Sequence, residues 1–107
     1  MIKLQRGQIG KKIGIDVTVR ANLAVSPNWE IVRKFKDGVI TIPEYISWYE
    51  AHLDIRRDEV YAWAKQLPEE TTFLCYCRND DFCHTYLLIN WLVSNFPMEF
   101  CSSYFNK

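Results

Sequence analysis

The sequence predicts an α/β domain with a short, mostly parallel sheet, about four helices, and two or three layers. Three observations support this prediction: short β-branched or apolar segments, helical segments of 3.6-residue period between and after them, and a length typical of one domain. Strands that alternate with helices usually form a parallel sheet with helices on its faces. We therefore expect residues 1–107 to form a single domain.

Three segments are predicted strands. Residues 13–19 (IGIDVTV) are short, alternating and rich in β-branched side chains. Residues 71–77 are almost continuously apolar, a pattern typical of a strand buried on both faces. Residues 98–105 form a third candidate. Right-handed crossovers would bring the carboxyl ends of the first two strands to the same edge of the sheet, where α/β domains bind ligands.

The first two predicted helices are indicated by their end signals. Ser26 and Pro27 have the residue types of an N-cap and a first helical position, and Asp37-Gly38 suits a helix end. Thr41 and Glu44 have the spacing of a capping box. The helix that follows should bury one face, which carries Tyr45, Trp48, Tyr49 and Leu53.

Two more helices are predicted further along the chain. One runs from about residue 56 to residue 66, with Val60, Trp63, Ala64 and Leu67 inward, and Pro68 breaks it. The last helix starts at Cys83 or His84 and ends near Asn95 and Pro97. Its apolar stripe consists of Leu87, Leu88, Trp91 and Leu92.

Composition limits the classes of function. The chain has 13 basic and 13 acidic residues, and this zero net charge argues against a duplex nucleic-acid binder. No apolar run approaches the length of a membrane span, and the first residues lack the apolar core of a signal peptide. We expect a cytoplasmic protein whose thiols are reduced and which needs no cofactor.

Cys75, Cys77, Cys83 and His84 lie close together in the sequence. Cys75 is expected in the interior, whereas Cys77, at the end of its strand, either packs or lines the crevice. At a helix start, Cys83 could be a thiolate nucleophile. Alternatively, the helix N–H groups with His84 and Arg78 could hold a phosphate or carboxylate. The third alternative is that Cys83 packs inward and His84 only caps the helix.

A zinc site is a further alternative. Cys77, Cys83 and His84 offer soft ligands, and Cys75 or Cys101 could supply a fourth. The spacing is poor, because ligands at the adjacent positions 83 and 84 would strain a tetrahedral site. We therefore expect no metal.

The predicted binding crevice, at the edge where the first two strands end, should also include residues from elsewhere in the chain. Arg20 follows the first predicted strand, and its guanidinium suits a phosphate or carboxylate. The predicted catalytic residues are Cys83 and His84. The predicted ligand-binding residues are Arg20, Ser26, Trp29, Cys77, Arg78, Cys83, His84 and Thr85.

Several motifs together resemble the domain-of-unknown-function 488 family. They are Cys75-Tyr76-Cys77-Arg78, Asp81-Phe82-Cys83-His84, the run LLINWL at 87–92, the strand DVTVR at 16–20, AVSPNW at 24–29 and FKDGVITIPEY at 35–45. The resemblance spans roughly residues 13–95, and the short form with DVTVR is similar to versions encoded by bacteriophages. It implies an α/β domain with its site around the Cys-His motif. The family usually has Arg after Cys-His, where this chain has Thr85, so an anion-binding role would be lost or moved to Arg78.

Three functions are compatible with these features. The first is a binding protein for a small phosphate-bearing or nucleotide-like ligand, which in a phage setting would sequester or block a host molecule or bind a host protein. The second is an enzyme that uses Cys83 and His84 on a nucleotide or glycosidic bond. The third is a homodimeric interaction module, because four Trp, six Tyr and six Phe exceed what so small a core needs.

Overall fold

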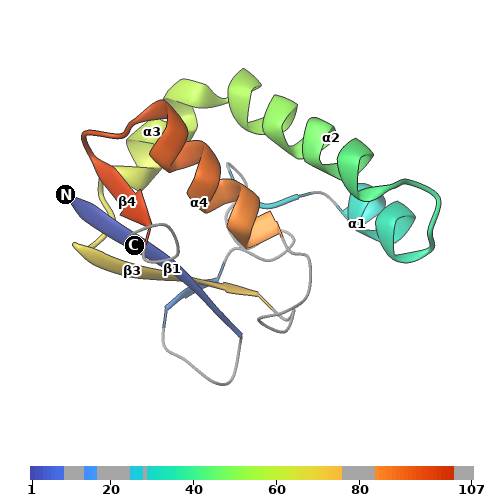
Figure 1. Cartoon of the computed structure of the whole chain (residues 1–107), viewed down its shortest axis with the longest axis horizontal. Helices are drawn as coiled ribbons and strands as arrows, with labels where there is room; N and C mark the ends of the chain where they lie inside the picture. The colour runs from blue at the N-terminus through green and yellow to red at the C-terminus, as the bar shows by residue number, and fades with distance from the viewer. Residues whose placement is uncertain (9–13, 17–24, 28, 76–83, 103–107) are drawn as a thin grey trace.

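The computed structural model describes residues 1–8, 14–16, 25–27, 29–75 and 84–102, without the side chains of Gln8, Asp16, Trp29 and Cys75. The described strands form one four-stranded sheet in the order β2-β3-β1-β4. They are β1 (Ile2–Gln8), β2 (Ile15–Asp16), β3 (Glu70–Cys75) and β4 (Phe100–Ser102). Every pairing is parallel, which confirms the predicted α/β class (Figure 1).

The central strand β1 was not predicted from the sequence. It pairs with β3 along six positions, from Lys3 opposite Glu70 to Gln8 opposite Cys75, and with β4 on its other side. Leu4 and Arg6 are both buried. The charged Arg6 at an inward position interrupts the alternation of apolar and polar residues that would otherwise indicate a strand.

The predicted strands are present, with different ends. The strand expected over 71–77 is described as Glu70–Cys75, and that expected over 98–105 as Phe100–Ser102. Of the strand expected over 13–19, the described part is the short β2. A Cβ on the preceding residue, Gly14, would lie 2.3 Å from the carbonyl oxygen of Thr72, so this close approach requires glycine.

Four helices are described: α1 (Trp29–Lys36), α2 (Ile42–Ile55), α3 (Arg57–Ala64) and α4 (His84–Asn95). The predicted start of α1 is wrong, because Ser26 and Pro27 lie in the turn before the helix. The predicted capping box is confirmed: the Thr41 amide donates to Glu44 Oε1 at 2.9 Å, and the Glu44 amide donates to Thr41 Oγ1 at 3.3 Å.

Helices α2, α3 and α4 lie on the same side of the sheet, and α4 packs directly on the strands (Figure 1). The Trp91 indole of α4 donates to Asp54 Oδ1 of α2 at 2.8 Å, which joins the two helices. The buried core consists of Leu4, Val25, Tyr45, Tyr49, Leu53, Val60, Ala64, Phe73, Leu88, Ile89, Trp91, Leu92 and Phe100. None of the described helices has the length and apolar character needed to cross a membrane.

Candidate functional site

The candidate site lies at the carboxyl edge of the sheet, where α4 begins. Strands β1 and β3 end side by side, with Gln8 opposite Cys75. Helix α4 begins at His84. Its first turn lies over the sheet near this edge (Figure 1). The backbone N–H groups of a helix start and the helix dipole favour a negative charge there. The edge is therefore suited to an anionic group.

Tyr49 joins the turn at residues 25–27 to the start of α4. Its hydroxyl donates to the Val25 carbonyl oxygen, and its ring packs edge-on against His84, with centroids 5.7 Å apart. Ser26 and His84 are both buried. The turn that contains Ser26 and the start of α4 at His84 therefore both contact Tyr49 of α2, through Val25 and His84.

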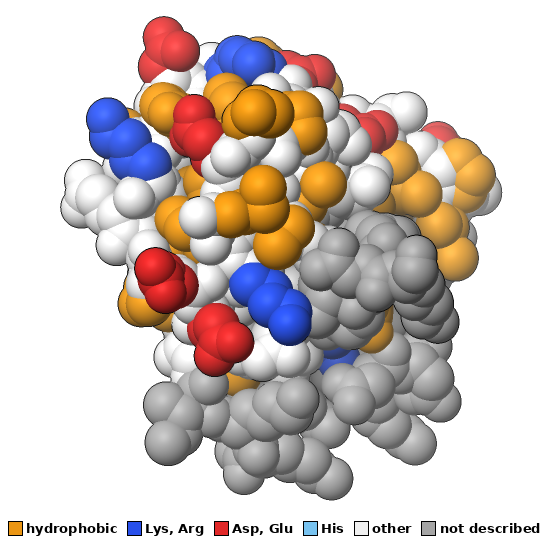
Figure 2. All heavy atoms as spheres, turned by 60° about the vertical axis from the view of Figure 1, so that its left-hand side comes forward, with side chains coloured by type: hydrophobic (Ala, Val, Ile, Leu, Met, Phe, Trp, Pro, Cys, Tyr) orange, Lys and Arg blue, Asp and Glu red, His pale blue; other side chains and the backbone are white. Residues whose placement is uncertain are grey.

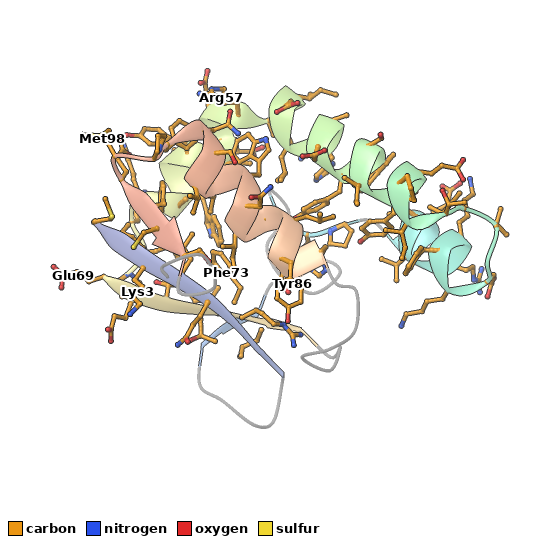
Figure 3. All side chains as sticks on the ribbon, in the orientation of Figure 1. Lys3, Arg57, Glu69, Phe73, Tyr86 and Met98 are labelled. Atoms are coloured by element: carbon orange, nitrogen blue, oxygen red, sulfur yellow. The ribbon has the colours of Figure 1, made fainter. Side chains whose placement is uncertain are left out.

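Arg6 of β1 adds a buried guanidinium at the same place. Arg6 is only 2% exposed, and its Nε donates to Thr85 Oγ1 at 3.3 Å. The guanidinium carbon lies 5.4 Å from the centre of the Tyr86 ring, within range of a cation–π interaction. Figure 3 shows Tyr86 where the first turn of α4 meets the sheet, away from Arg57, Met98 and Lys3.

The sequence analysis missed Arg6 because it missed the strand that carries it. Between Leu4 and Gly7, the arginine looks like an ordinary surface residue. The only available signal was the alternation of Ile2, Leu4 and Arg6 on one face, which becomes meaningful once the strand is known to be central.

The described residues include only part of the predicted site. Ser26, His84 and Thr85 are among the described residues. Thr85 is completely buried, and its hydroxyl accepts a hydrogen bond from Arg6 Nε. For Trp29 the backbone is described, as the start of α1. The remaining predicted site residues, Arg20, Cys77, Arg78 and Cys83, lie outside the described residues.

Within the described part of the chain, no three His, Cys, Asp or Glu side chains are grouped so that they could hold a metal ion. Cys101 lies in β4 and is half-buried. The other cysteines of the zinc alternative have side chains outside the described residues, so that alternative stays a hypothesis.

The second histidine, His52, lies in α2 outside the candidate site. It contacts Tyr49, the residue that packs against His84. Its ring stacks on Trp48 at 5.1 Å and on Tyr49 at 6.2 Å between centroids. Its Nε2 is buried and has no hydrogen-bond partner among the described residues. Burial, reinforced by the charge of Arg56 and opposed by that of Glu59, lowers the pKa of His52 below its ordinary value of 6.5.

The fold and the edge site together define an α/β domain with its candidate site at the carboxyl ends of parallel strands. A family model described as "Active DUF488-N3 subclade" (DUF488-N3a) matches residues 12–96. The chain therefore belongs to the DUF488 family, as its motifs suggested. The match leaves out β1 and thus Arg6. No curated protein and no solved structure matches the chain significantly.

Proposed function

We propose that this protein binds a small phosphate-bearing, nucleotide-like ligand at the carboxyl edge of its sheet. The observation that carries the proposal is the contact of Tyr49 with both the Val25 carbonyl and the His84 ring. It places a buried serine turn beside the amino terminus of α4, at the edge where parallel sheets bind ligands. A helix start favours an anion, and phosphate is one of the groups recognised in this way.

The remaining predicted residues extend this proposal. Arg20, Trp29, Cys77, Arg78, Cys83 and Thr85 are the further candidates for ligand contact. If the protein acts in the cytoplasm of a phage-infected host, binding without turnover would sequester a host metabolite or block a host protein. The balanced charge of the chain suits a small ligand better than a duplex nucleic acid.

A Cys/His-dependent enzyme is the second candidate. The observation that favours it is the word "Active" in the description of the matching family model. In this function, His84 at the start of α4 would act on a bound nucleotide or glycosidic bond together with Cys83.

A homodimer or host-protein complex is the third candidate. Met98 and Ile55 are 86% and 84% exposed, an unusual position for large apolar side chains. The side of the molecule turned forward in Figure 2 has hydrophobic side chains scattered among acidic and basic ones, as in the mixed surface of a transient interface.

Native mass spectrometry of the purified full chain, before and after denaturation, tests the three candidates together. We expect a monomer that carries a nucleotide-sized mass, which is released intact. Incubation with added nucleotides distinguishes the enzyme, because it would convert part of the nucleotide into products of different mass. A dimer mass without bound nucleotide would favour the interaction module and would count against the binding function.

Matched variants locate the ligand within the chain. His84→Gln should lower nucleotide occupancy by about tenfold, the effect of one charge-assisted hydrogen bond of roughly 1.4 kcal/mol. Ser94→Ala is the control, because Ser94 is an exposed residue near the other end of α4. Equal occupancy in wild type and His84→Gln would place the ligand elsewhere.

A further inference from the structure

We propose that His52 makes ligand binding at the candidate site sensitive to pH, because a proton on its ring displaces that ring from Tyr49. This inference rests on the proposed function and adds a means of regulating the same site. In this role His52 acts through Tyr49 and is not itself a ligand contact.

A chain of aromatic contacts leads from His52 to the site. The His52 ring is nearly parallel to the rings of Trp48 and Tyr49, at 16° and 19°, with centroids 5.1 and 6.2 Å apart. Tyr49 packs edge-on against His84 at 5.7 Å, and its hydroxyl donates to the Val25 carbonyl oxygen. His52 therefore contacts the residue that joins the turn at Val25 to α4. When the His52 ring moves away, Tyr49 loses one of the rings that hold it in place.

The buried nitrogen Nε2 makes the contact between His52 and Tyr49 dependent on charge. Within the described part of the chain, Nε2 has no hydrogen-bond partner. A neutral imidazole accommodates this with Nε2 as its unprotonated nitrogen, whereas a protonated imidazole donates from both nitrogens. A buried N–H that carries charge and lacks an acceptor is unfavourable. Because His52 is only half-buried, the charged ring turns toward water and gives up its contact with Tyr49.

The groups around His52 set the direction of the effect. Among the described residues, the charges that act on it are those of Arg56 and Glu59, which pair with each other at 3.8 Å. Tyr49, the titratable group in ring contact with His52, is an uncharged phenol in this pH range. Burial and then the Arg56 charge lower the pKa of His52 from its ordinary value of 6.5, and Glu59 opposes them. Ligand binding should therefore weaken as the pH falls below 6.5.

The first test needs no ligand and follows the full wild-type chain by nuclear magnetic resonance from pH 8 to pH 5. The His52 ring signal, assigned by its loss in His52→Phe, should titrate with a midpoint below pH 6.5. The amide signal of Ser26, which shares a peptide unit with the Val25 carbonyl, should shift with the same midpoint. In His52→Phe, which keeps an aromatic ring beside Tyr49, this shift of the Ser26 amide should vanish.

The two neighbouring charges supply matched controls. Glu59→Gln should lower the midpoint of His52, because the carboxylate favours the protonated ring. Arg56→Gln should raise the midpoint, because the guanidinium disfavours the protonated ring. In both variants the shift of the Ser26 amide should move together with the His52 midpoint.

The second test measures AMP affinity by calorimetry at pH 7.5 and pH 5. Between these two values, wild type should lose about fivefold more affinity than His52→Phe, a ratio typical of modest coupling between two sites. Because both proteins bind the same ligand, the comparison cancels the titration of the AMP phosphate.

Two results would overturn the inference, and they differ from each other. If AMP binds but wild type and His52→Phe lose equal affinity toward pH 5, His52 does not regulate the site and the proposed function stands. If wild type binds neither AMP nor inorganic phosphate at pH 7.5, the proposed function fails together with the regulatory role of His52.

Discussion

At the scale of single residues, Arg6 and Thr85 bear on how this chain differs from the pattern of its family. Thr85 stands where that pattern has an arginine after Cys-His, and the sequence alone suggested that Arg78 takes over a lost charge. In the structure, the Arg6 guanidinium donates to the Thr85 hydroxyl. A strand residue thus brings a guanidinium to the first turn of the helix that lacks one.

His52 is a second residue whose surroundings determine its charge. It lies in the last turn of α2, where a protonated histidine would suit the helix dipole. Its ring instead stacks on Trp48 and Tyr49, and within the part of the chain that the structure describes the buried Nε2 has no hydrogen-bond partner. Desolvation therefore outweighs the dipole, and the neutral imidazole is the form that the fold accommodates.

This environment predicts a dependence of stability on pH. Because the folded-state pKa of His52 is lowered, the unfolded chain binds more protons below pH 6.5, and the stability that His52 contributes above this pH is lost as the pH falls through the folded-state pKa. In urea unfolding at pH 8, 7, 6 and 5, His52→Phe should lose less stability toward pH 5 than wild type. Parallel pH profiles for the two proteins would contradict this assignment.

At the scale of elements, the start of α2 depends on local chemistry alone. Thr41 and Glu44 form reciprocal hydrogen bonds. Hydrogen bonding from the backbone and then the side chain of Thr41 lowers the pKa of the Glu44 carboxyl. The preceding turn contains Gly38 at φ 75°, a left-handed conformation that glycine adopts without strain. Both signals can be read from a few adjacent residues, which explains why the sequence located this helix start correctly.

Thr41→Ala should lower the free energy of unfolding by about 1 kcal/mol, the usual effect of losing an N-cap side chain. Thr41→Ser keeps the hydroxyl and should stay close to wild type. Urea unfolding monitored by circular dichroism measures both variants. If Thr41→Ser lost as much stability as Thr41→Ala, the effect would come from the lost methyl group and not from the cap.

At the scale of the whole molecule, α2 connects the site to the core. Tyr49 is completely buried, contacts His84 of α4, and holds the turn at Val25 through its hydroxyl. Trp91 and Asp54 tie the same two helices together at a second point. The positions of Ser26 and His84 relative to each other therefore depend on the packing of α2 over α4.

Tyr49→Phe tests this dependence, because it keeps the ring and removes only the hydroxyl. We expect a loss of about 1–2 kcal/mol in the free energy of unfolding and a weaker binding of nucleotide. Tyr61→Phe is the control: it also loses one hydrogen bond, from Tyr61 to Glu99, but away from the site. If both variants bound nucleotide as wild type does, the site would not depend on the turn at Val25.

The sequence by itself determined what depends on neighbouring residues. The parallel α/β class, the capping box at Thr41, the buried strand around Phe73, the stripe of α4 and the family all followed from local patterns. These patterns are periodicities, caps and motifs, and each depends on a few adjacent side chains. They can therefore be recognised without knowledge of the tertiary structure.

Only the tertiary structure decided which strand is central and which charge lies at the site. β1 forms because β3 and β4 supply its hydrogen-bond partners, over separations of more than 60 residues. Arg6 is buried there because α4 covers that face of the sheet and Thr85 accepts from its Nε. The partners of β1 lie far away in the sequence, and the charged Arg6 interrupts its apolar alternation, so the amino-acid pattern of the segment did not reveal the strand.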